Sequence, residues 1–421
     1  MQCNNSELLD TCKMESLKLV IVGHVDHGKS TLIGRLLYDT NSLPEGKMDE
    51  IKEICKALGR EVEFGFIMDH LEEERDQGIT IDTTQIFFKT NKRKYVIIDA
   101  PGHVEFIKNM ITGASQAEAA ILIVDATEGV QEQTKRHSYI LNLLGLKQIV
   151  VIINKMDLVD YKEAKYNEVK NELIEFLNNI NITPKAVIPI SAKNGYFIAK
   201  KNKELSWYKG PTVLESLDLF HIRKLPVNQP LRFCVQDVYK YEKRIAVGKV
   251  ESGELIKGDK IKILPSGEET VVESIEEFLK DDVKKAEAGK NTGLVTKDKV
   301  FLDRGNIIVS PENLPTITDI IHANIFNMDK MPLTKREKFL FKCATQEIMC
   351  HIEKIEKVIN SSTLEILGRD VEKINDKEVA EIIIKTEKPI VIEDFNYIEA
   401  LGRFVLERNN ITCAGGIIKT N

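Results

Sequence analysis

The stretch from Gly23 to Thr31, which reads Gly-His-Val-Asp-His-Gly-Lys-Ser-Thr, constrains the fold of this chain more than any other. An apolar run over residues 17–22, interrupted only by Lys18, precedes it, and an amphipathic stretch follows it. A strand, a glycine-bounded turn and a helix start are therefore predicted in that order. We expect Gly23 and Gly28 to adopt backbone angles that a side chain would obstruct. Successive N–H groups beside a helix N-terminus can then point at one anion, which predicts a phosphate-binding loop.

The loop also predicts individual roles. Lys29 is expected to reach the β- and γ-phosphates of a nucleotide, and the Ser30 hydroxyl is expected to ligate Mg²⁺. The same loop occurs in ATPases, kinases and GTPases, so motifs further along the chain have to identify the nucleotide. In Asp99-Ala100-Pro101-Gly102, Asp99 is expected to hold Mg²⁺ through water. Gly102 is expected to donate its backbone N–H to the γ-phosphate.

A charged insertion between the first predicted helix and residue 94 contains Gly78-Ile79-Thr80-Ile81. Thr80 is expected to place its hydroxyl and its carbonyl on the metal and the γ-phosphate. Because that contact exists only while the γ-phosphate is present, the sequence predicts a conformational switch at Thr80.

Histidines flank the predicted phosphate site. His103 directly follows the Asp-Ala-Pro-Gly motif and is expected to orient the attacking water, the alternative being a helix-start histidine with no role. Val25 and Ile79 would form an apolar gate that keeps His103 from the water. His24 and His27 have no carboxylate or thiol partners at metal-binding spacing, so we interpret them as packing residues of the loop.

The base is indicated by Asn154-Lys155-Met156-Asp157, at the end of another predicted strand. Guanine offers two donors, N1–H and the 2-amino group, that the Asp157 carboxylate can accept together, whereas adenine lacks the 2-amino group. The Lys155 stem would cover the base, and Asn154 would tie this turn to the phosphate loop. Ser191-Ala192-Lys193, after the last strand, could offer a backbone N–H to guanine O6. GTP and GDP are therefore the predicted ligands.

The complete predicted site contains catalytic, metal-binding and nucleotide-contacting residues. The predicted catalytic residues are His103, Lys29 and Thr80. The predicted metal ligands are Ser30, Thr80 and Asp99. The predicted nucleotide contacts are Gly23, His24, Val25, Asp26, His27, Gly28, Lys29, Ser30, Thr31, Asp99, Gly102, Asn154, Lys155, Asp157, Ser191, Ala192 and Lys193.

The order of apolar runs predicts the fold. At 421 residues the chain is too long for one ordinary core. Up to about residue 220, short Ile/Val-rich runs alternate with helical patterns, which predicts a mostly parallel sheet with helices on both faces. Beyond that, many short strands separated by turns predict antiparallel β-barrels. The expected parts are a leader (1–16), a P-loop GTPase domain (17–224) and two barrels (225–310 and 311–421).

Composition narrows the class of protein and its surroundings. The formal net charge is −6 and the sequence pI is about 5.9, which argues mildly against a nucleic-acid partner. The seven cysteines are scattered, with no Cys-x-x-Cys pair, so neither a disulfide framework nor a zinc site is expected. No apolar run approaches about 18 residues, so no membrane span is expected. These features predict a cytoplasmic protein.

The motifs GHVDHGKST, GITID, DAPGH and NKMD, followed by two barrels, resemble the translation-factor superfamily of GTPases over about residues 17–419. Two branches of this superfamily are similar to the chain. One is the elongation factor that carries aminoacyl-tRNA in archaea and eukaryotes. The other branch is the GTPase (large) subunit of bacterial heterodimeric sulfate adenylyltransferase. Gln77, Val104-Glu105 and the endings 401–406 and 414–418 are similar to the second branch, which we therefore favour.

That resemblance implies a smaller catalytic ATP sulfurylase subunit as partner in a heterodimer, with GTP hydrolysis driving adenylyl sulfate synthesis. The alternatives are a carrier of aminoacyl-tRNA, or a regulatory GTPase of an unrelated partner enzyme. Two departures lie in the third predicted domain: Asn327 stands where the family tends to carry tryptophan, and Thr412-Cys413 stands near a usually glycine-rich run. They put the partner contacts of that domain in doubt.

Overall fold

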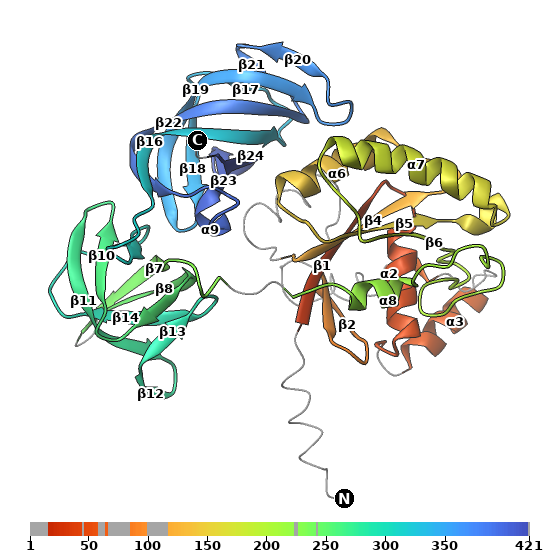
Figure 1. The fold of residues 1–421 in the computed structure, drawn as a ribbon, viewed down its shortest axis with the longest axis horizontal. Helices are drawn as coiled ribbons and strands as arrows, with labels where there is room; N and C mark the ends of the chain where they lie inside the picture. The colour runs from red at the N-terminus through yellow and green to blue at the C-terminus, as the bar shows by residue number, and fades with distance from the viewer. Residues whose placement is uncertain are drawn as a thin grey trace, which may run out of the picture. The chain divides into compact units, whose positions relative to one another are not determined.

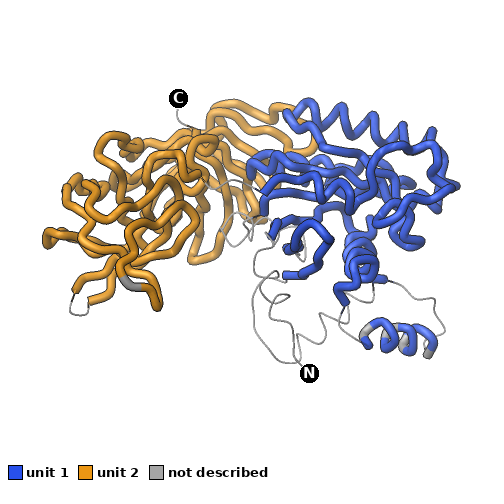
Figure 2. The backbone as a smooth tube through the Cα atoms, turned by 60° about the horizontal axis from the view of Figure 1, so that its bottom comes forward, with its two compact units in different colours: residues 1–223 blue, residues 224–421 orange. Residues whose placement is uncertain are grey.

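A computed structural model describes residues 16–43, 46–57, 64–65, 85–98, 117–222, 226–240 and 243–419. The chain divides into two compact units, residues 1–223 and residues 224–421, coloured separately in Figure 2. The expected boundary after residue 224 lies next to this division.

The first unit is built on a six-stranded sheet in the order β2-β3-β1-β4-β5-β6. All neighbouring strands are parallel except β2, which runs antiparallel to β3. Every residue of β4 and β5 is buried, which explains why these strands read as continuous apolar runs. The strands are β1 (Ser16–Gly23), β2 (Gln85–Lys89), β3 (Lys94–Ile98), β4 (Ala119–Asp125), β5 (Ile149–Asn154) and β6 (Ala186–Pro189).

Helices lie on both faces of this sheet, with α6 and α7 on one side and α2 and α8 on the other (Figure 1). Helix α7 buries Tyr166, Val169, Leu173 and Leu177, whose spacing of three or four residues makes one apolar face. The helices are α2 (Lys29–Asp39), α3 (Lys47–Ala57), α6 (Glu132–Leu143), α7 (Glu163–Asn179) and α8 (Val213–Asp218), with a 3₁₀ turn η1 (Met156–Val159).

The second unit holds two antiparallel seven-stranded sheets that close into barrels. The first has the order β10-β15-β7-β8-β14-β11-β12 and is closed by β10–β11, and β9 pairs with β13 beside it. Its strands are β7 (Arg232–Lys240), β8 (Arg244–Ser252), β9 (Glu254–Ile256), β10 (Lys260–Leu264), β11 (Glu268–Glu277), β12 (Lys280–Val283), β13 (Lys285–Glu287), β14 (Asn291–Thr296) and β15 (Ile307–Val309).

The second barrel has the order β18-β23-β24-β16-β22-β19-β20 and is closed by β18–β19, with β17–β21 as a separate pair. An α/β domain followed by two antiparallel barrels was predicted, and this is confirmed. The elements are β16 (Thr316–Asn327), β17 (Leu333–Thr334), β18 (Lys338–Cys343), β19 (Gln346–Asn360), β20 (Ile366–Arg369), β21 (Lys373–Ile374), β22 (Glu378–Ile392), α9 (Glu399–Gly402), β23 (Arg403–Arg408) and β24 (Ile411–Ile418).

A buried ion pair joins the two barrels. Arg232 of β7 is fully buried, and its Nη2 lies 2.6 Å from Oε1 of Glu393, which follows β22. The same guanidinium donates to the Asn313 side chain at 3.0 Å. All three guanidinium nitrogens of Arg232 donate to acceptors on Glu393, Asn313 or Leu231, and these bonds offset the cost of taking the cation out of water.

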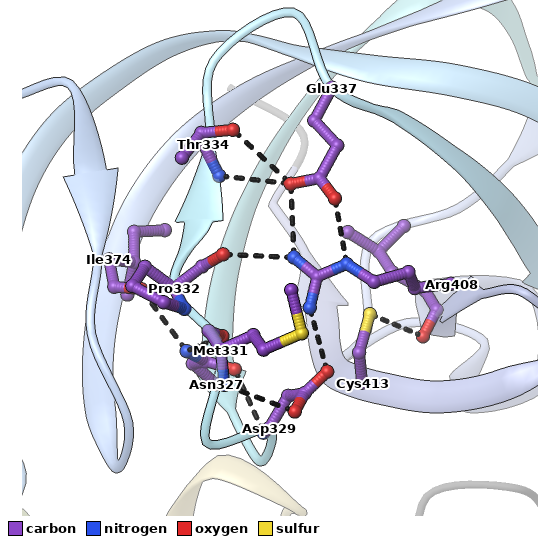
Figure 3. Close-up of polar contacts among 10 residues, drawn as sticks. Asn327, Asp329, Met331, Pro332, Thr334, Glu337, Ile374, Arg408 and Cys413 are labelled. Carbon is purple, nitrogen blue, oxygen red and sulfur yellow. Dashed lines mark hydrogen bonds and ion pairs between the residues drawn. The ribbon is translucent and has the colours of Figure 1, made fainter.

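Asn327, one of the two departures noted in the sequence, has a structural use (Figure 3). Its side chain is buried, donates to the carbonyls of Met331 and Ile374, and accepts from the N–H of Asp329 at 3.0 Å. Arg408 closes the same turn by donating to the Glu337 carboxylate through Nε and Nη2, at 2.7 and 3.0 Å. The amide at position 327 therefore holds a turn of the second barrel together.

The described cysteines are Cys55, Cys234, Cys343, Cys350 and Cys413, and all of them are buried free thiols. Burial raises the pKa of the Cys343 thiol to about 12, so it stays neutral at ordinary pH. Within the described residues, no helix is both long enough and apolar enough to cross a membrane.

Candidate nucleotide-binding site

The phosphate loop, residues 23–29, connects β1 to α2, as predicted. Gly28 adopts a left-handed conformation with φ of 92°, and a Cβ there would lie 2.3 Å from Asn154 Nδ2, so only glycine fits. The expectation for Gly23 was wrong, because its φ is not in the left-handed region. A Cβ at Gly23 would instead lie 2.5 Å from the carbonyl oxygen of Ile123, so the close packing of β1 on β4 requires glycine there.

The polar groups of the loop gather at the start of α2. Lys29 Nζ donates to the carbonyls of Gly23, at 2.9 Å, and His24, at 2.7 Å, so its ammonium is folded back over the loop. Ser30 is exposed in the first turn of the helix. An exposed hydroxyl next to a lysine at a helix N-terminus fits a hard cation bound between protein and phosphate oxygens.

Both histidines of the loop pack against protein groups, as interpreted from the sequence. His27 is fully buried, with its Nδ1 3.3 Å from the carbonyl oxygen of Ile123 and its Nε2 3.2 Å from Glu128. Burial lowers the pKa of His27 although both of those acceptors oppose it. His24 Nδ1 lies 2.7 Å from Gln133 Oε1, and its ring meets the His27 ring edge-on at 5.2 Å.

Asn154 links the phosphate loop to the turn that follows β6. Its Nδ2 donates to the carbonyl of His27 at 2.9 Å, and its Oδ1 accepts from the N–H of Ala192 at 3.0 Å. The link to the phosphate loop is the one predicted from the sequence. The N–H groups of Ser191, Ala192 and Lys193 were the predicted donors to guanine O6. In this structure the Ala192 N–H already donates to Asn154.

Lys155 is held by a residue whose role the sequence reasoning missed. Its Nζ lies 2.7 Å from Oδ2 of Asp125, the buried last residue of β4. Burial raises the pKa of the Asp125 carboxyl, but the bonds from Lys155 and from both the N–H and the hydroxyl of Thr127 outweigh it, and the net pKa is lowered. Lys155 also has a positive φ of 60°, so the backbone turns directly after β5. The ion pair therefore fixes the ammonium and orients the stem.

Asp157, in η1, is held by a side chain of the base loop, which we define as residues 191–196. The Ser191 hydroxyl donates to Asp157 Oδ1 at 2.6 Å and accepts from the N–H of Asn194 at 3.3 Å. The sequence predicts only a backbone N–H contact for Ser191, so this role of its hydroxyl is a finding of the structure. A half-buried carboxylate oriented in this way can accept two parallel donors from the edge of a base.

Several predicted site residues lie outside the described residues: Ile79, Thr80, Asp99, Gly102 and His103. The predicted metal contacts of Thr80 and Asp99, the γ-phosphate contact of Gly102 and the water-orienting role of His103 stay predictions. The described part of the site brings together the phosphate loop, Asn154, Lys155, Asp157 and the base loop.

Comparison with known proteins places this geometry in context. The family described as elongation factor Tu GTP binding domain matches residues 14–279, and GTP-eEF1A C-terminal domain-like matches residues 320–419. Elongation factor 1-alpha of Methanopyrus kandleri is 39% identical over 421 residues, covering 96% of this chain and 97% of that protein. Elongation factor 1-alpha of Thermoplasma acidophilum is 38% identical over 410 residues, covering 95% and 96%. A solved structure of sup35 complexed with GDP covers 100% of this chain and 97% of that one, but only at 23% identity and a TM-score of 0.44.

These relatives do not support the sulfate adenylyltransferase branch that the sequence stretches favoured. The ending that favoured it has a structural explanation. A Cβ at Gly416 in β24 would lie 2.4 Å from the carbonyl oxygen of Asn324 and 2.6 Å from the Phe404 ring. The barrel itself requires that glycine, so its presence carries no information about a partner subunit.

Proposed function

Because the chain belongs to the elongation factor Tu GTP-binding family, we propose that it is an elongation-factor-like GTPase that carries aminoacyl-tRNA in its GTP-bound state. The observation that supports this most is the identity of 39% with an elongation factor 1-alpha along nearly the whole of both chains. As in its family generally, the chain binds GTP and GDP with Mg²⁺. The proposed partners are aminoacyl-tRNA and the ribosome.

In this proposal the phosphate loop binds the triphosphate with its backbone N–H groups. Lys29 exchanges its two carbonyl acceptors, Gly23 and His24, for phosphate oxygens. Ser30 would hold Mg²⁺ together with Thr80 and Asp99. The cation neutralises charge on the β- and γ-phosphates.

Guanine would be recognised by the Asp157 carboxylate, which Ser191 orients from one side. The Lys155 stem would lie along the face of the base while its ammonium stays on Asp125. A carboxylate left without its two donors disfavours adenine, and we expect a GTP-over-ATP preference of at least about 10³.

Hydrolysis in this proposal depends on residues after β3 and before β2. Thr80 and the Gly102 N–H would sense the γ-phosphate, and His103 would orient the attacking water once the gate formed by Val25 and Ile79 opens. The Val25 side chain is 55% exposed on the phosphate loop, so it is available to form such a gate. We expect His103→Ala to keep GTP affinity and to lower single-turnover hydrolysis by about 10²-fold or more. An unchanged hydrolysis rate would remove His103 from the mechanism.

The carrier function can be tested by protection of the ester bond in aminoacyl-tRNA. The purified chain loaded with GTP is expected to slow spontaneous deacylation, because the aminoacyl end is covered, and the GDP-loaded chain is expected to protect much less. Equal deacylation with GTP-loaded chain, GDP-loaded chain and no protein would contradict the proposal.

The rival is the GTPase subunit of sulfate adenylyltransferase, supported by Gln77 and Val104-Glu105. It requires a catalytic ATP sulfurylase subunit that copurifies with this chain and makes adenylyl sulfate only when GTP is hydrolysed. That result, together with no protection of aminoacyl-tRNA, would favour the rival. The acidic net charge describes the whole chain and is compatible with a local basic surface that binds nucleic acid.

A further inference from the structure

An arginine behind the nucleotide site makes contacts that none of the proposed roles uses. Arg35 lies in the second turn of α2, and its Nε donates to Asp39 Oδ1 at 3.0 Å. Its guanidinium carbon lies 4.9 Å from the centre of the Phe64 ring and 5.5 Å from the centre of the Tyr38 ring. The side chain is only 19% exposed, so the cation is largely enclosed by these groups.

The same guanidinium touches the base loop. A Cβ at Gly195 would lie 2.2 Å from Arg35 Cζ and 2.7 Å from its Nε, and Gly195 has a positive φ of 75°. The base loop is closed by the Tyr196 N–H, which donates to the Ser191 carbonyl at 3.1 Å. Arg35 therefore contacts the tip of the loop whose first residue orients Asp157.

Phe64 and Gly65 approach α2 on one face. A Cβ at Gly34 would lie 2.1 Å from the carbonyl oxygen of Phe64, and a Cβ at Gly65 would lie 3.7 Å from Thr31 Oγ1. Phe64 is 9% exposed as a residue, and the centre of its ring lies 5.3 Å from the centre of the Tyr38 ring. Thr31, Gly34 and Tyr38 share one face of a helix at this spacing, and that face begins beside Ser30.

We propose that Arg35 is a positioning residue for guanine recognition, which holds the base loop through Gly195 and is itself held by Phe64. The proposal rests on the proposed binding of guanine by Asp157. A planar guanidinium can lie flat against a glycine backbone and an aromatic ring, and a lysine ammonium cannot. Without Arg35 the base loop loses its contact at Gly195 and becomes more mobile. The hydrogen bond from Ser191 that orients Asp157 is then formed for a smaller fraction of the time. The loss falls on the base contacts rather than on the phosphate contacts.

The test compares GDP with inosine diphosphate, which lacks the 2-amino group, on the full chain. Arg35→Ala is expected to raise the GDP dissociation rate by about threefold to tenfold, the range for loss of one cation–π contact. It should also narrow the preference for GDP over inosine diphosphate, and Arg35→Lys should do both to a smaller extent. The control is Arg136→Ala in α6, because Arg136 also pairs with a carboxylate four residues away and is also 19% exposed. It should leave both quantities unchanged.

Equal weakening of GDP and inosine diphosphate by Arg35→Ala would show a merely structural role and overturn the proposal, as would no weakening of either. If the alanine variant does not fold, Arg35→Lys decides, because it keeps the charge and loses the planar group. A wild-type chain that does not prefer GDP over ADP would instead refute the guanine site on which the proposal rests.

Phe64 provides an independent arm of the test. Phe64→Ala is expected to raise the GDP dissociation rate in the same direction, and the double variant with Arg35→Ala should dissociate GDP no faster than Arg35→Ala alone. Fully additive changes in the free energy of GDP dissociation would contradict the link between Phe64 and Arg35, because two residues that act through the same contact give non-additive changes.

Discussion

The phosphate loop and the base loop both follow strands of the same sheet, but different kinds of contact hold them. The phosphate loop takes much of its shape from contacts within itself, with Gly28 in the left-handed region and Lys29 folded onto nearby carbonyls, and Asn154 adds a link from β5. The base loop is shaped by side chains that come from other elements: Asn154, Asp157 and Arg35. A loop of the first kind can be recognised in a sequence, whereas a loop of the second kind depends on residues brought together by folding.

The largest effect is expected at the base. Asp157→Asn removes an acceptor that guanine needs and presents a donor instead. The GTP-over-ATP preference of at least about 10³ should be lost, and xanthosine nucleotides should bind better than guanosine nucleotides. Equilibrium titration with fluorescent GDP, xanthosine diphosphate and ADP measures this. An unaltered order of affinities would exclude Asp157 from base recognition.

The second-largest effect on nucleotide affinity is expected in the phosphate loop. Gly28→Ala forces a side chain into a left-handed conformation and against Asn154 Nδ2, so GDP affinity should fall by about 10-fold to 100-fold. The matched control is Gly46→Ala, because Gly46 has a φ of 77° and a Cβ there would have no atom of the described residues within 4 Å. It carries the strain without the clash and should leave GDP affinity unchanged. Similar losses in both variants would contradict the link through Asn154.

The Ser191 hydroxyl is expected to matter less. Ser191→Ala removes the donor that orients Asp157, and GDP affinity should fall by about threefold to tenfold, as for one hydrogen bond. Ser138→Ala serves as control, because the Ser138 hydroxyl is also buried and donates at 2.8 Å to the carbonyl of Thr134 within α6. Identical GDP affinities for Ser191→Ala and wild type would mean that Asp157 needs no support from the base loop.

The smallest effect is a pH dependence at Asp125. Because the folded pKa of Asp125 is lowered, its bonds stabilise the chain above the ordinary carboxyl pKa, and that stability is lost as pH falls through the folded value. Asp125→Asn should lower Tm by about 2–4 °C near neutral pH. The difference from wild type should shrink below about pH 4. A difference in Tm that stays constant down to pH 2 would contradict the assignment of the lowered pKa.

The sequence predicted the fold well where the signal was local. The buried strands β4 and β5 read as apolar runs because helices cover both faces of the sheet. Strand β2 was missed, because it lies at the sheet edge and its alternate residues are exposed. The branch assignment, which the relatives do not support, relied on short stretches such as the one that contains Gly416, and barrel packing alone explains that glycine.

The amino-acid sequence by itself determined the phosphate loop, because a strand, a turn and a helix start are set by neighbouring residues, and it also led to the proposal that the Asp157 carboxylate binds the base. Only the tertiary structure decided how that carboxylate is held. Ser191 is 34 residues from Asp157, and Ala192, in the same base loop, is 38 residues from Asn154. Arg35 and Gly195 are even further apart in sequence and meet only when α2 packs beside the base loop. No spacing rule encodes such contacts, since they depend on which elements the folded sheet places side by side.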